Sequence, residues 1–400
     1  MSDVDDQKWP YLRVLHIIIT VNKEYGGPVE GLTQSIKFRQ KNNQDIEVVT
    51  LDNPDEQFVK DFSCKVHGIG PVNPKYGYTS KLKNWIITHA HRFDVAVIHG
   101  LWNPSSIEGW QGCTSAGLPY VMFTHGMMDP WFKKAYPLKH LIKQLYWFIQ
   151  GRVLRDAHKV LFTSAEEQRL AQGVFWGYNY KSKVVAYAAA DVAEQKSASI
   201  SKFNELIPNL KGQPYLLYLS RIHEKKGCDL LLKGFAKAVQ RPELQLVMAG
   251  PCNDDFIHKL KDLAKSLGIS NRVHWPGMLK GDFKAAVFQA AEAFVLTSHQ
   301  ENFGIAVAEA LAYGKPVLIS DQINIWREIE TGNGGIVASD TVEGATEILM
   351  KWEKMIDQQR VAMGMAARKV YENNFTVKAA AKDLTNVLFN ATCQKNLIGE

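Results

Sequence analysis

Two carboxylates and the residues between them form the most specific chemical pattern in the sequence. Glu301 and Glu309 make a Glu-x7-Glu spacing, in which the segment 301–304 separates a strand-like run, 293–297, from a helical run of small and apolar residues. The amino end of a helix presents free N–H groups and partial positive charge, which suits a diphosphate. The two carboxylates could then accept hydrogen bonds from hydroxyl groups on either side of that anion. The structural alternative is that Glu301 only begins a helix and Glu309 faces solvent.

Two cations follow an earlier strand-like run. Arg221 and Lys226 come directly after YLLYLS, residues 215–220, and Gly227 opens the next helical pattern. Arginine offers a planar fork for phosphate oxygens and lysine a point charge, so both could reach one anion from the same strand end. An equally common fate for a basic loop is solvated surface, and this alternative stays open.

Together these patterns resemble glycosyltransferase family 4, which carries a Gly-Arg-x4-Lys-Gly loop and, later in the chain, a Glu-x7-Glu helix. Ser220 stands where the family usually has the first glycine. The resemblance covers nearly the whole chain, because three further motifs fall in register: Gly26-Gly27-Pro28, Thr124-His125-Gly126 and residues 273–278. One departure is the run Ala188-Ala189-Ala190-Asp191, where the family often has Asn-Gly-Val-Asp.

The resemblance implies a role for each matching residue. Arg221 and Lys226 would neutralise the departing diphosphate, Glu301 would hold sugar hydroxyls, and His125 would support the sugar from the other domain. A lone histidine is more often structural, so that alternative is kept for His125. The implied donor-binding residues are Gly27 beside the phosphate, Gly277 and Met278 at the base, Asn302, Phe303 and Gly304 at the sugar and β-phosphate, and Glu309 at the ribose.

The family also implies a reaction without a metal or other cofactor and with retained anomeric configuration. The sequence holds one Asp-x-Asp tripeptide, Asp3-Val4-Asp5, in an acidic segment that we interpret as a disordered tail. Two cations and a helix amino end would take the place of a metal, and preorganised charge of this kind supplies on the order of several kcal/mol to a transition state.

Short β-branched runs alternate with helical patterns such as 29–40 and 139–155, which predicts parallel sheets in an α/β protein. The alternation pauses over the polar segment 191–213, which we interpret as linker and loop. The family resemblance makes this a GT-B fold: two facing Rossmann-like, doubly wound domains with a cleft between them. The expected domains are 1–190, acceptor-side, completed by the helix 376–400, and 191–375, nucleotide-sugar-binding. The strand-like runs are 14–20, 47–51, 94–99, 119–124 and 159–163, then 215–220, 245–249, 273–275, 293–297, 316–320 and 335–338.

Composition narrows the class of protein. The chain has 400 residues, 46% of them hydrophobic, and a net charge of +6, too small an excess to indicate nucleic acid by itself. Five scattered cysteines without a Cys-x-x-Cys pair argue against a disulfide framework or a zinc site. The acidic start is unlike a signal peptide, and no apolar run approaches the roughly 20 residues that span a bilayer. A cytoplasmic enzyme is therefore expected, with peripheral association at the inner leaflet as an open option.

The segment 131–158 is the part of the sequence that could associate with a membrane, because it mixes aromatic residues with lysines and arginines. Such a stretch could lie on an anionic membrane surface. The favoured alternative is an ordinary helix pair that buries Leu141, Leu145 and Phe148 in the first domain.

The sequence thus predicts retaining, metal-independent transfer of a hexose from a nucleotide-diphosphate sugar to a glycan or lipid-linked acceptor in polysaccharide biosynthesis. UDP-glucose is the preferred donor, on family frequency. A sugar-nucleotide epimerase and a non-catalytic nucleotide-sugar binder are the alternatives. A nicotinamide dehydrogenase is disfavoured, because no strand-linked Gly-x-Gly-x-x-Gly is followed by an acidic residue.

Overall fold

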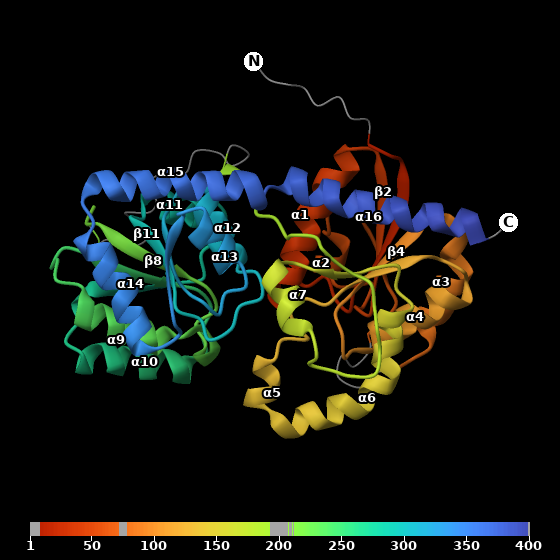
Figure 1. Ribbon diagram of the computed structural model, residues 1–400, viewed down its shortest axis with the longest axis horizontal. Helices are drawn as coiled ribbons and strands as arrows, with labels where there is room; N and C mark the ends of the chain where they lie inside the picture. Colours follow the sequence, from red (N-terminus) through yellow and green to blue (C-terminus); the bar gives the residue numbers. More distant parts are fainter. Residues whose placement is uncertain (1–8, 72–77, 193–206, 208–209, 211, 399–400) are drawn as a thin grey trace, which may run out of the picture. The chain divides into compact units, whose positions relative to one another are not determined.

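The computed structural model describes the chain except residues 1–8, 72–77, 193–206, 208–209, 211 and 399–400 (Figure 1). The Asp3-Val4-Asp5 tripeptide and most of the expected linker 191–213 lie outside the described residues. The chain divides into two compact units. Unit 1 comprises residues 1–187 and 377–400, and unit 2 comprises residues 188–376.

Unit 1 is built on a seven-stranded parallel sheet with strand order β3-β2-β1-β4-β5-β6-β7 in the part of the chain that the structure describes. The strand order reverses direction at β1, which is the topology of a doubly wound sheet. The strands are β1 (Leu12–Ile17), β2 (Gln44–Thr50), β3 (Lys65–Gly68), β4 (Val95–His99), β5 (Tyr120–Phe123), β6 (Val160–Phe162) and β7 (Ser182–Val184).

Helices cover both faces of this sheet, because side chains alternate along each strand. On β4, Val95 and Val97 pack into one core with α1 (Gly27–Lys41), α2 (Gln57–Lys60) and α16 (Val377–Ile398). Ala96 and Ile98 pack into the opposite core with α3 (Lys81–His89), α4 (Pro104–Ser115), α6 (Pro137–Arg155) and α7 (Ala165–Ala171). The C-terminal helix α16 contributes Leu384, Val387, Leu388 and Ala391 to the first of these cores.

Unit 2 repeats this plan: its described residues form a six-stranded parallel sheet with the order β10-β9-β8-β11-β12-β13. Its strands are β8 (Tyr215–Leu219), β9 (Gln245–Ala249), β10 (Val273–Gly277), β11 (Ala293–Leu296), β12 (Val317–Ser320) and β13 (Gly335–Ala338). Its helices include α9 (Cys228–Ala238), α10 (Asp254–Ser266), α11 (Gly281–Ala290), α12 (Ile305–Ala312), α13 (Trp326–Thr331), α14 (Val342–Lys354) and α15 (Asp357–Asn374).

The predicted fold class is confirmed: the chain forms two parallel, doubly wound α/β sheets. Two strands, β3 and β7, were not predicted. They lie at the two edges of the unit 1 sheet and have the sequences KVHG and SKV, in which no residue is fully buried. An edge strand with one covered side does not need a continuous apolar run, so its sequence resembles a loop.

One favoured interpretation is wrong. Leu141, Leu145 and Phe148 on α6 are exposed, with 62%, 66% and 55% of their surface accessible. The helix instead turns Trp147, Val153 and Leu154 toward the core, because these residues share the opposite side of the helix. In the described residues, no helix is long and apolar enough to cross a membrane.

Candidate functional site

Two loops of unit 2 meet at the carboxyl edge of its sheet. β8 and β11 are adjacent parallel strands, so the loops that follow them leave the sheet side by side (Figure 1). The Thr297 hydroxyl donates to the Gly227 carbonyl at 2.8 Å, and the Ser298 hydroxyl donates to the Lys225 carbonyl at 3.1 Å. The His299 N–H donates to the same Lys225 carbonyl at 2.9 Å. The basic loop and the carboxylate loop are therefore held to each other by one main-chain hydrogen bond and by two hydroxyl groups that donate to main-chain carbonyls.

Gly227 is the residue that allows this approach. Its φ is +60°, in the left-handed region, and a Cβ at this position would lie 1.9 Å from the Thr297 carbonyl oxygen. Only glycine satisfies both conditions. Because Gly227 ends the short turn Glu224–Lys226, it also fixes the direction in which the Lys226 side chain leaves the chain.

Lys226 and Glu301 form an ion pair between the two loops. Lys226 is 5% exposed, which is unusual for a lysine and is accommodated by this partner. Burial opposes ionisation of Glu301, but the Lys226 ammonium beside it outweighs burial, with help from Lys225 and the Asn302 N–H, and lowers the pKa of Glu301 below its ordinary value. Glu301 is thus charged at neutral pH.

The amino end of α12 lies beside this pair. Gly304 precedes the helix with φ +75°, and a Cβ there would come 3.3 Å from Cγ of Glu301 and 3.1 Å from Val307. The Asn302 N–H donates to Oε1 of Glu301 at 3.1 Å. The first N–H groups of a helix have no partner within the helix, so α12 adds partial positive charge close to the Lys226–Glu301 pair.

Phe303 has a different position from its neighbours. Its side chain is 3% exposed and packs edge-on against Phe375 with ring centroids 5.5 Å apart. The ring therefore belongs to the core of unit 2, and Phe303 can offer a ligand only its main chain.

Glu309, inside α12, is paired with a lysine that the sequence did not suggest. Oε1 of Glu309 accepts a hydrogen bond from the Lys284 ammonium of α11 at 2.5 Å, and the Glu309 side chain is only 14% exposed. Glu309 is therefore not a solvent-facing residue. Lys284 lies outside the recognised motifs, and nothing in its local sequence pairs it with Glu309.

The remaining predicted residues of unit 2 lie at the ends of strands β8 and β10. Arg221 is exposed, and its carbonyl accepts from the Tyr218 hydroxyl at 3.0 Å. Gly277 ends β10 with φ +74°, and its carbonyl accepts from the Gly250 N–H at 2.8 Å. Met278 follows it and is 59% exposed. The structure thus brings Lys226, Glu301, Asn302 and Gly304 together, and it places Arg221, Gly277 and Met278 at the ends of β8 and β10.

Two predicted residues belong to unit 1. Gly27 is the first residue of α1 and follows Gly26, whose φ is +85°. His125 follows β5 and has φ +52°, a left-handed conformation that is uncommon for a residue with a side chain. A buried carboxylate holds the chain there: Oε1 of Glu167 accepts from the Gly126 N–H at 2.6 Å and from the Thr124 hydroxyl at 2.7 Å.

The His125 ring contacts two residues that sequence reasoning missed. Its Nε2 lies 3.0 Å from Nδ1 of His99, and its Nδ1 lies 2.5 Å from the Tyr187 hydroxyl. Burial lowers the pKa of His125 to about 3, so the ring is neutral at physiological pH. The available signal was His99 itself, a histidine inside the otherwise apolar strand VAVIH.

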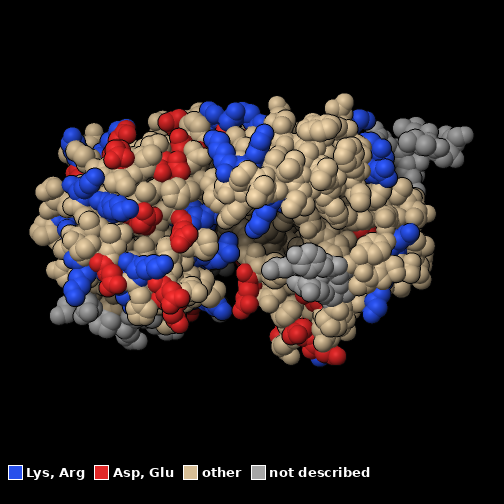
Figure 2. Space-filling view, turned by 90° about the horizontal axis from the view of Figure 1, so that it is seen from below, with Lys and Arg blue, Asp and Glu red and all other residues tan. Residues whose placement is uncertain are grey.

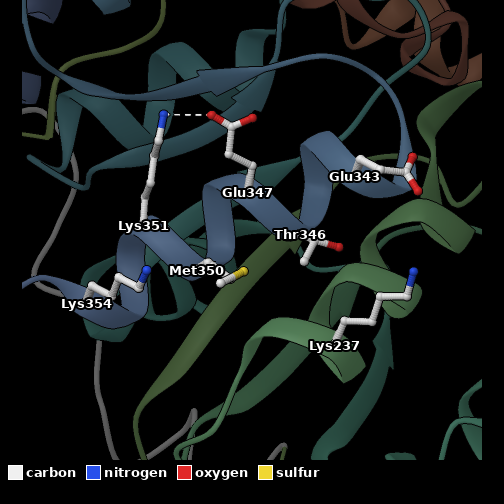
Figure 3. A pocket seen from close by; sticks show the side chains of 7 residues that line it. All are labelled: Lys237, Glu343, Thr346, Glu347, Met350, Lys351 and Lys354. Atoms are coloured by element: carbon white, nitrogen blue, oxygen red, sulfur yellow. Dashed lines mark ion pairs between the residues drawn. The ribbon is translucent and has the colours of Figure 1, made fainter.

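Unit 2 also has a surface hollow of about 440 Å³ between α9 and α14 (Figure 3). Figure 3 shows Lys237 on one helix and Glu343, Glu347 and Lys351 on the other, with Lys351 paired to Glu347 at 2.8 Å. No predicted site residue lines it. We therefore assign this hollow no part in the candidate site.

The two doubly wound units and the charged loops at a sheet edge define a two-domain α/β protein with a charged site at the carboxyl edge of one sheet. Comparison with known proteins supplies the family. Residues 26–187 match the model "Glycosyl transferase 4-like domain", and residues 200–370 match "Glycosyl transferases group 1". The chain therefore belongs to the GT-B glycosyltransferases of family 4.

Curated relatives agree with this assignment. The chain is 26% identical over 346 residues to GDP-mannose:cellobiosyl-diphosphopolyprenol alpha-mannosyltransferase of Xanthomonas campestris, covering 84% of this chain and 86% of that protein. It is 33% identical over 130 residues to mannosylfructose-phosphate synthase of Agrobacterium fabrum, covering 31% of this chain and 29% of that protein. The matched region thus spans under half the length of the Agrobacterium fabrum protein and of two further curated glycosyltransferases.

Solved structures show the same fold. HepE of Anabaena in complex with UDP superposes with a TM-score of 0.77 at 19% identity, over 95% of this chain and 100% of that one. Its complex with UDP-glucose gives a TM-score of 0.75 at 18% identity, over the same shares.

Proposed function

We propose that this chain transfers a hexose from a nucleotide-diphosphate sugar to a glycan or lipid-linked glycan acceptor in polysaccharide assembly, with retained anomeric configuration and without a metal ion. The observation that carries the proposal is the Lys226–Glu301 pair beside the amino end of α12. A diphosphate is the anion for which a buried ammonium and free helix N–H groups are suited together.

The chemistry follows from where negative charge develops. The bond between the anomeric carbon and the phosphate oxygen breaks, a bond from that carbon to the acceptor oxygen forms, and the proton of the acceptor hydroxyl passes to the departing phosphate oxygen. Negative charge develops on the nucleotide diphosphate as its bond to the sugar breaks. Lys226 and the α12 amino end are fixed before the reaction, so they stabilise this charge without having to reorganise. Glu301, held by the same lysine, is then placed to accept hydrogen bonds from sugar hydroxyls. Retention is inferred from the family.

UDP-glucose is the donor that we propose. The support is a solved neighbour, HepE of Anabaena, whose complex with UDP-glucose has the same fold. The chief rival is GDP-mannose, the substrate in the name of the Xanthomonas campestris relative. Both donors present the same diphosphate to Lys226. They differ at the base, where Gly277 and Met278 are predicted to lie, and at C2 of the sugar, where Glu301 is predicted to lie.

A transfer assay with both donors and a lipid-linked glycan acceptor, with and without EDTA, tests the proposal. We expect release of UDP from UDP-glucose that EDTA does not change. Lys226→Ala should abolish release, whereas Lys237→Ala, which removes the same charge from the exposed outer face of α9, should not. Full activity of Lys226→Ala would reject the site, and loss of activity with EDTA would reject metal independence.

Incubation of donors without acceptor separates the alternatives. Slow hydrolysis of the donor fits a transferase, whereas accumulation of an epimerised donor would favour an epimerase. Binding of donor with neither outcome, and no transfer to any acceptor, would favour a non-catalytic binder.

The apolar outer face of α6 suggests where a lipid-linked acceptor would be met. Its exposed residues follow helical spacing, which gives one continuous stripe on the solvent side. Lys133, Lys134, Lys139 and Arg152 are exposed on α5 (Trp131–Ala135) and α6 around it. Figure 2 views the molecule from the side on which α5 and α6 lie in Figure 1 and shows a broad uncharged area with Lys and Arg side chains along its margin. The α6 stripe consists of Leu138, Leu141, Ile142, Leu145, Phe148 and Ile149.

We propose that the α6 stripe lies on an anionic lipid bilayer. Apolar side chains flanked by cations match the acyl region and the anionic headgroups of such a surface. Flotation with vesicles containing an anionic lipid should recover the wild-type chain, and neutral vesicles should recover less. Leu141→Gln/Leu145→Gln should stay unbound, whereas Ile356→Gln/Val361→Gln, at comparably exposed positions of unit 2, should float normally. Binding by neither vesicle would reject this proposal.

A further inference from the structure

A chain of buried polar side chains runs through unit 1 from His125 to the C-terminal helix. Starting at His125, the chain links His99 at 3.0 Å and then His16 of β1, whose Nδ1 lies 2.8 Å from Nε2 of His99. Nε2 of His16 lies 3.2 Å from a terminal nitrogen of Arg39, which comes from α1. His16 and Arg39 are wholly buried, and His99 is 3% exposed.

Arg39 gives this chain its direction. A guanidinium group has only donors, so Nε2 of His16 must accept and cannot carry hydrogen. The hydrogen of the neutral His16 ring is then on Nδ1, and it donates to Nε2 of His99. The same holds for the next ring: its Nε2 accepts, so its hydrogen must be on Nδ1, because a neutral imidazole has one donor and one acceptor nitrogen.

The end of the chain follows from the same rule. His99 donates from Nδ1 to Nε2 of His125, so the His125 hydrogen is on Nδ1 and points to the Tyr187 hydroxyl oxygen 2.5 Å away. On the other side, Nε of Arg39 donates to the Gln44 side-chain oxygen at 2.8 Å, and the Gln44 amide donates to the Thr385 hydroxyl of α16 at 2.8 Å. Every hydrogen bond in the chain is directed away from Arg39.

We infer that Arg39 is a positioning residue that fixes His125, through His16 and His99, in the neutral form with hydrogen on Nδ1. Arg39 has no contact with His125, so its effect passes entirely through the two histidines. Reversing one ring would require reversal of all three, and it would turn Nε2–H of His16 toward an N–H of Arg39. Two N–H donors would then face each other, and neither could bond to water instead, because both side chains are wholly buried.

The electrostatic environment keeps the three histidine rings neutral. Burial lowers the pKa of His16 well below its ordinary value, and Arg39 beside it adds to that effect. Burial also lowers the pKa of His99, with contributions from His16, His125 and Arg39. Arg39 itself, with a pKa lowered by burial to about 9, stays charged at neutral pH and so remains a donor.

This arrangement defines what His125 can do. Its Nε2 is occupied as an acceptor and its Nδ1–H as a donor, so the imidazole has no ring nitrogen with which to remove a proton from an acceptor hydroxyl. A general-base role for His125 is excluded while the hydrogen bonds from Arg39 through His16 and His99 are intact. The inference goes beyond the proposed function, because the tautomer is a property of unit 1 whether or not the chain transfers a sugar.

Nitrogen NMR of the full chain labelled with ¹⁵N-histidine measures the tautomer directly, because a protonated and an unprotonated ring nitrogen have well-separated shifts. In the wild-type protein we expect His16, His99 and His125 to carry hydrogen on Nδ1 only. Their ring-nitrogen shifts should not change between about pH 8 and pH 6, the range in which an ordinary histidine titrates. Hydrogen on Nε2 of His125, or titration of its ring in that range, would overturn the inference before any variant is made.

Two variants test the part played by Arg39. Arg39→Met removes the fixed donor with little change in volume, so neither direction is imposed on the three rings, and we expect the Nδ1–H signal of His125 to weaken as hydrogen also appears on Nε2. Thr385→Val removes the far end of the polar chain but leaves the Arg39–His16 contact, and it should keep the wild-type tautomers. A folded Arg39→Met protein with unchanged histidine shifts would show that Arg39 does not set the direction.

Discussion

The ammonium of Lys226 and the carboxylate of Glu301 are joined across two loops that are also hydrogen-bonded to each other, through the His299 N–H and through two hydroxyl groups. The pair holds a nearly buried cation at a sheet edge in a neutral combination with its counter-ion. An arriving diphosphate would compete with Glu301 for the same ammonium. The pair is therefore expected to contribute to both folding and donor binding, and these two effects can be measured separately.

For folding, Lys226→Met and Glu301→Gln should each lower the free energy of unfolding by about 1–3 kcal/mol, because each leaves the other polar group without its buried partner. The double variant should lose less than the sum of the two, since neither stranded group remains. Urea unfolding measures all three. The control is Lys351–Glu347, an exposed pair of α14, for which the coupling should stay below about 0.5 kcal/mol. Additive effects at Lys226 and Glu301 would contradict the pairing.

Glu309→Gln should weaken donor binding more than it slows turnover. Glu309 is predicted to hold the ribose, which is far from the breaking bond, so its loss should raise KM for the donor on the order of tenfold with kcat nearly unchanged. Glutamine keeps an oxygen for Lys284, which limits structural damage. Steady-state kinetics with varied donor test this, with Glu347→Gln as the surface control. A fall in kcat at constant KM would place Glu309 at the reacting centre instead.

Most strands of unit 2 were predictable from apolar runs. The run 335–338 coincides with the partly buried edge strand β13, whose sequence GIVA is apolar. The run 245–249 coincides with the inner strand β9, in which every residue is buried. Such strands need continuous β-branched or apolar residues, and the sequence shows them directly. The loops after β8 and β11 were found for a related reason, since each begins where an apolar run stops.

The face that α6 presents was not predictable. The helix has apolar residues on two sides, Trp147 and Leu154 toward the core and Leu141 and Leu145 toward solvent. Periodicity reports that apolar residues share a side of a helix, but it does not report which side meets the sheet. Only the packing of α6 on unit 1 decides between them.

Contacts between residues that are distant in the sequence could not be predicted either. Lys284 reaches Glu309 from a separate helix, and His16 reaches His99 from a neighbouring strand that lies 83 residues away. No local spacing encodes such contacts. A histidine inside an apolar strand indicates a buried polar contact, but it does not name the partner.

Gly227→Ala should destabilise unit 2 far more than Gly268→Ala. Both glycines have positive φ, +60° and +71°, but a Cβ at Gly227 would lie 1.9 Å from the Thr297 carbonyl oxygen, whereas nothing lies within 4 Å at Gly268. Gly268→Ala should therefore cost only the backbone strain, about 1 kcal/mol, and Gly227→Ala should cost at least about 3 kcal/mol because the two loops must separate. Thermal unfolding compares them. Equal losses would mean that the loops do not approach as closely as described.

The buried histidines of unit 1 should make the protein less stable as the pH falls. The folded pKa values of His16 and His99 lie well below the ordinary value of about 6.5, because burial opposes their protonation. Above that pH both states are neutral and the histidines contribute no pH dependence. Below it the unfolded chain binds protons that the folded chain does not, so the free energy of unfolding decreases until the pH reaches the folded pKa.

Between pH 7 and pH 5 each of these two histidines should therefore lower the free energy of unfolding by roughly 2 kcal/mol. Urea unfolding followed by near-UV circular dichroism measures this slope. His16→Gln should reduce the slope by the contribution of one histidine even if it lowers stability at pH 7, because the slope and the offset are independent. His258→Gln, at an exposed position of α10, should leave the slope unchanged. If His16→Gln kept the full wild-type slope, His16 would not be held neutral in the folded protein. Arg39 could then not fix the position of the hydrogen on the first histidine ring.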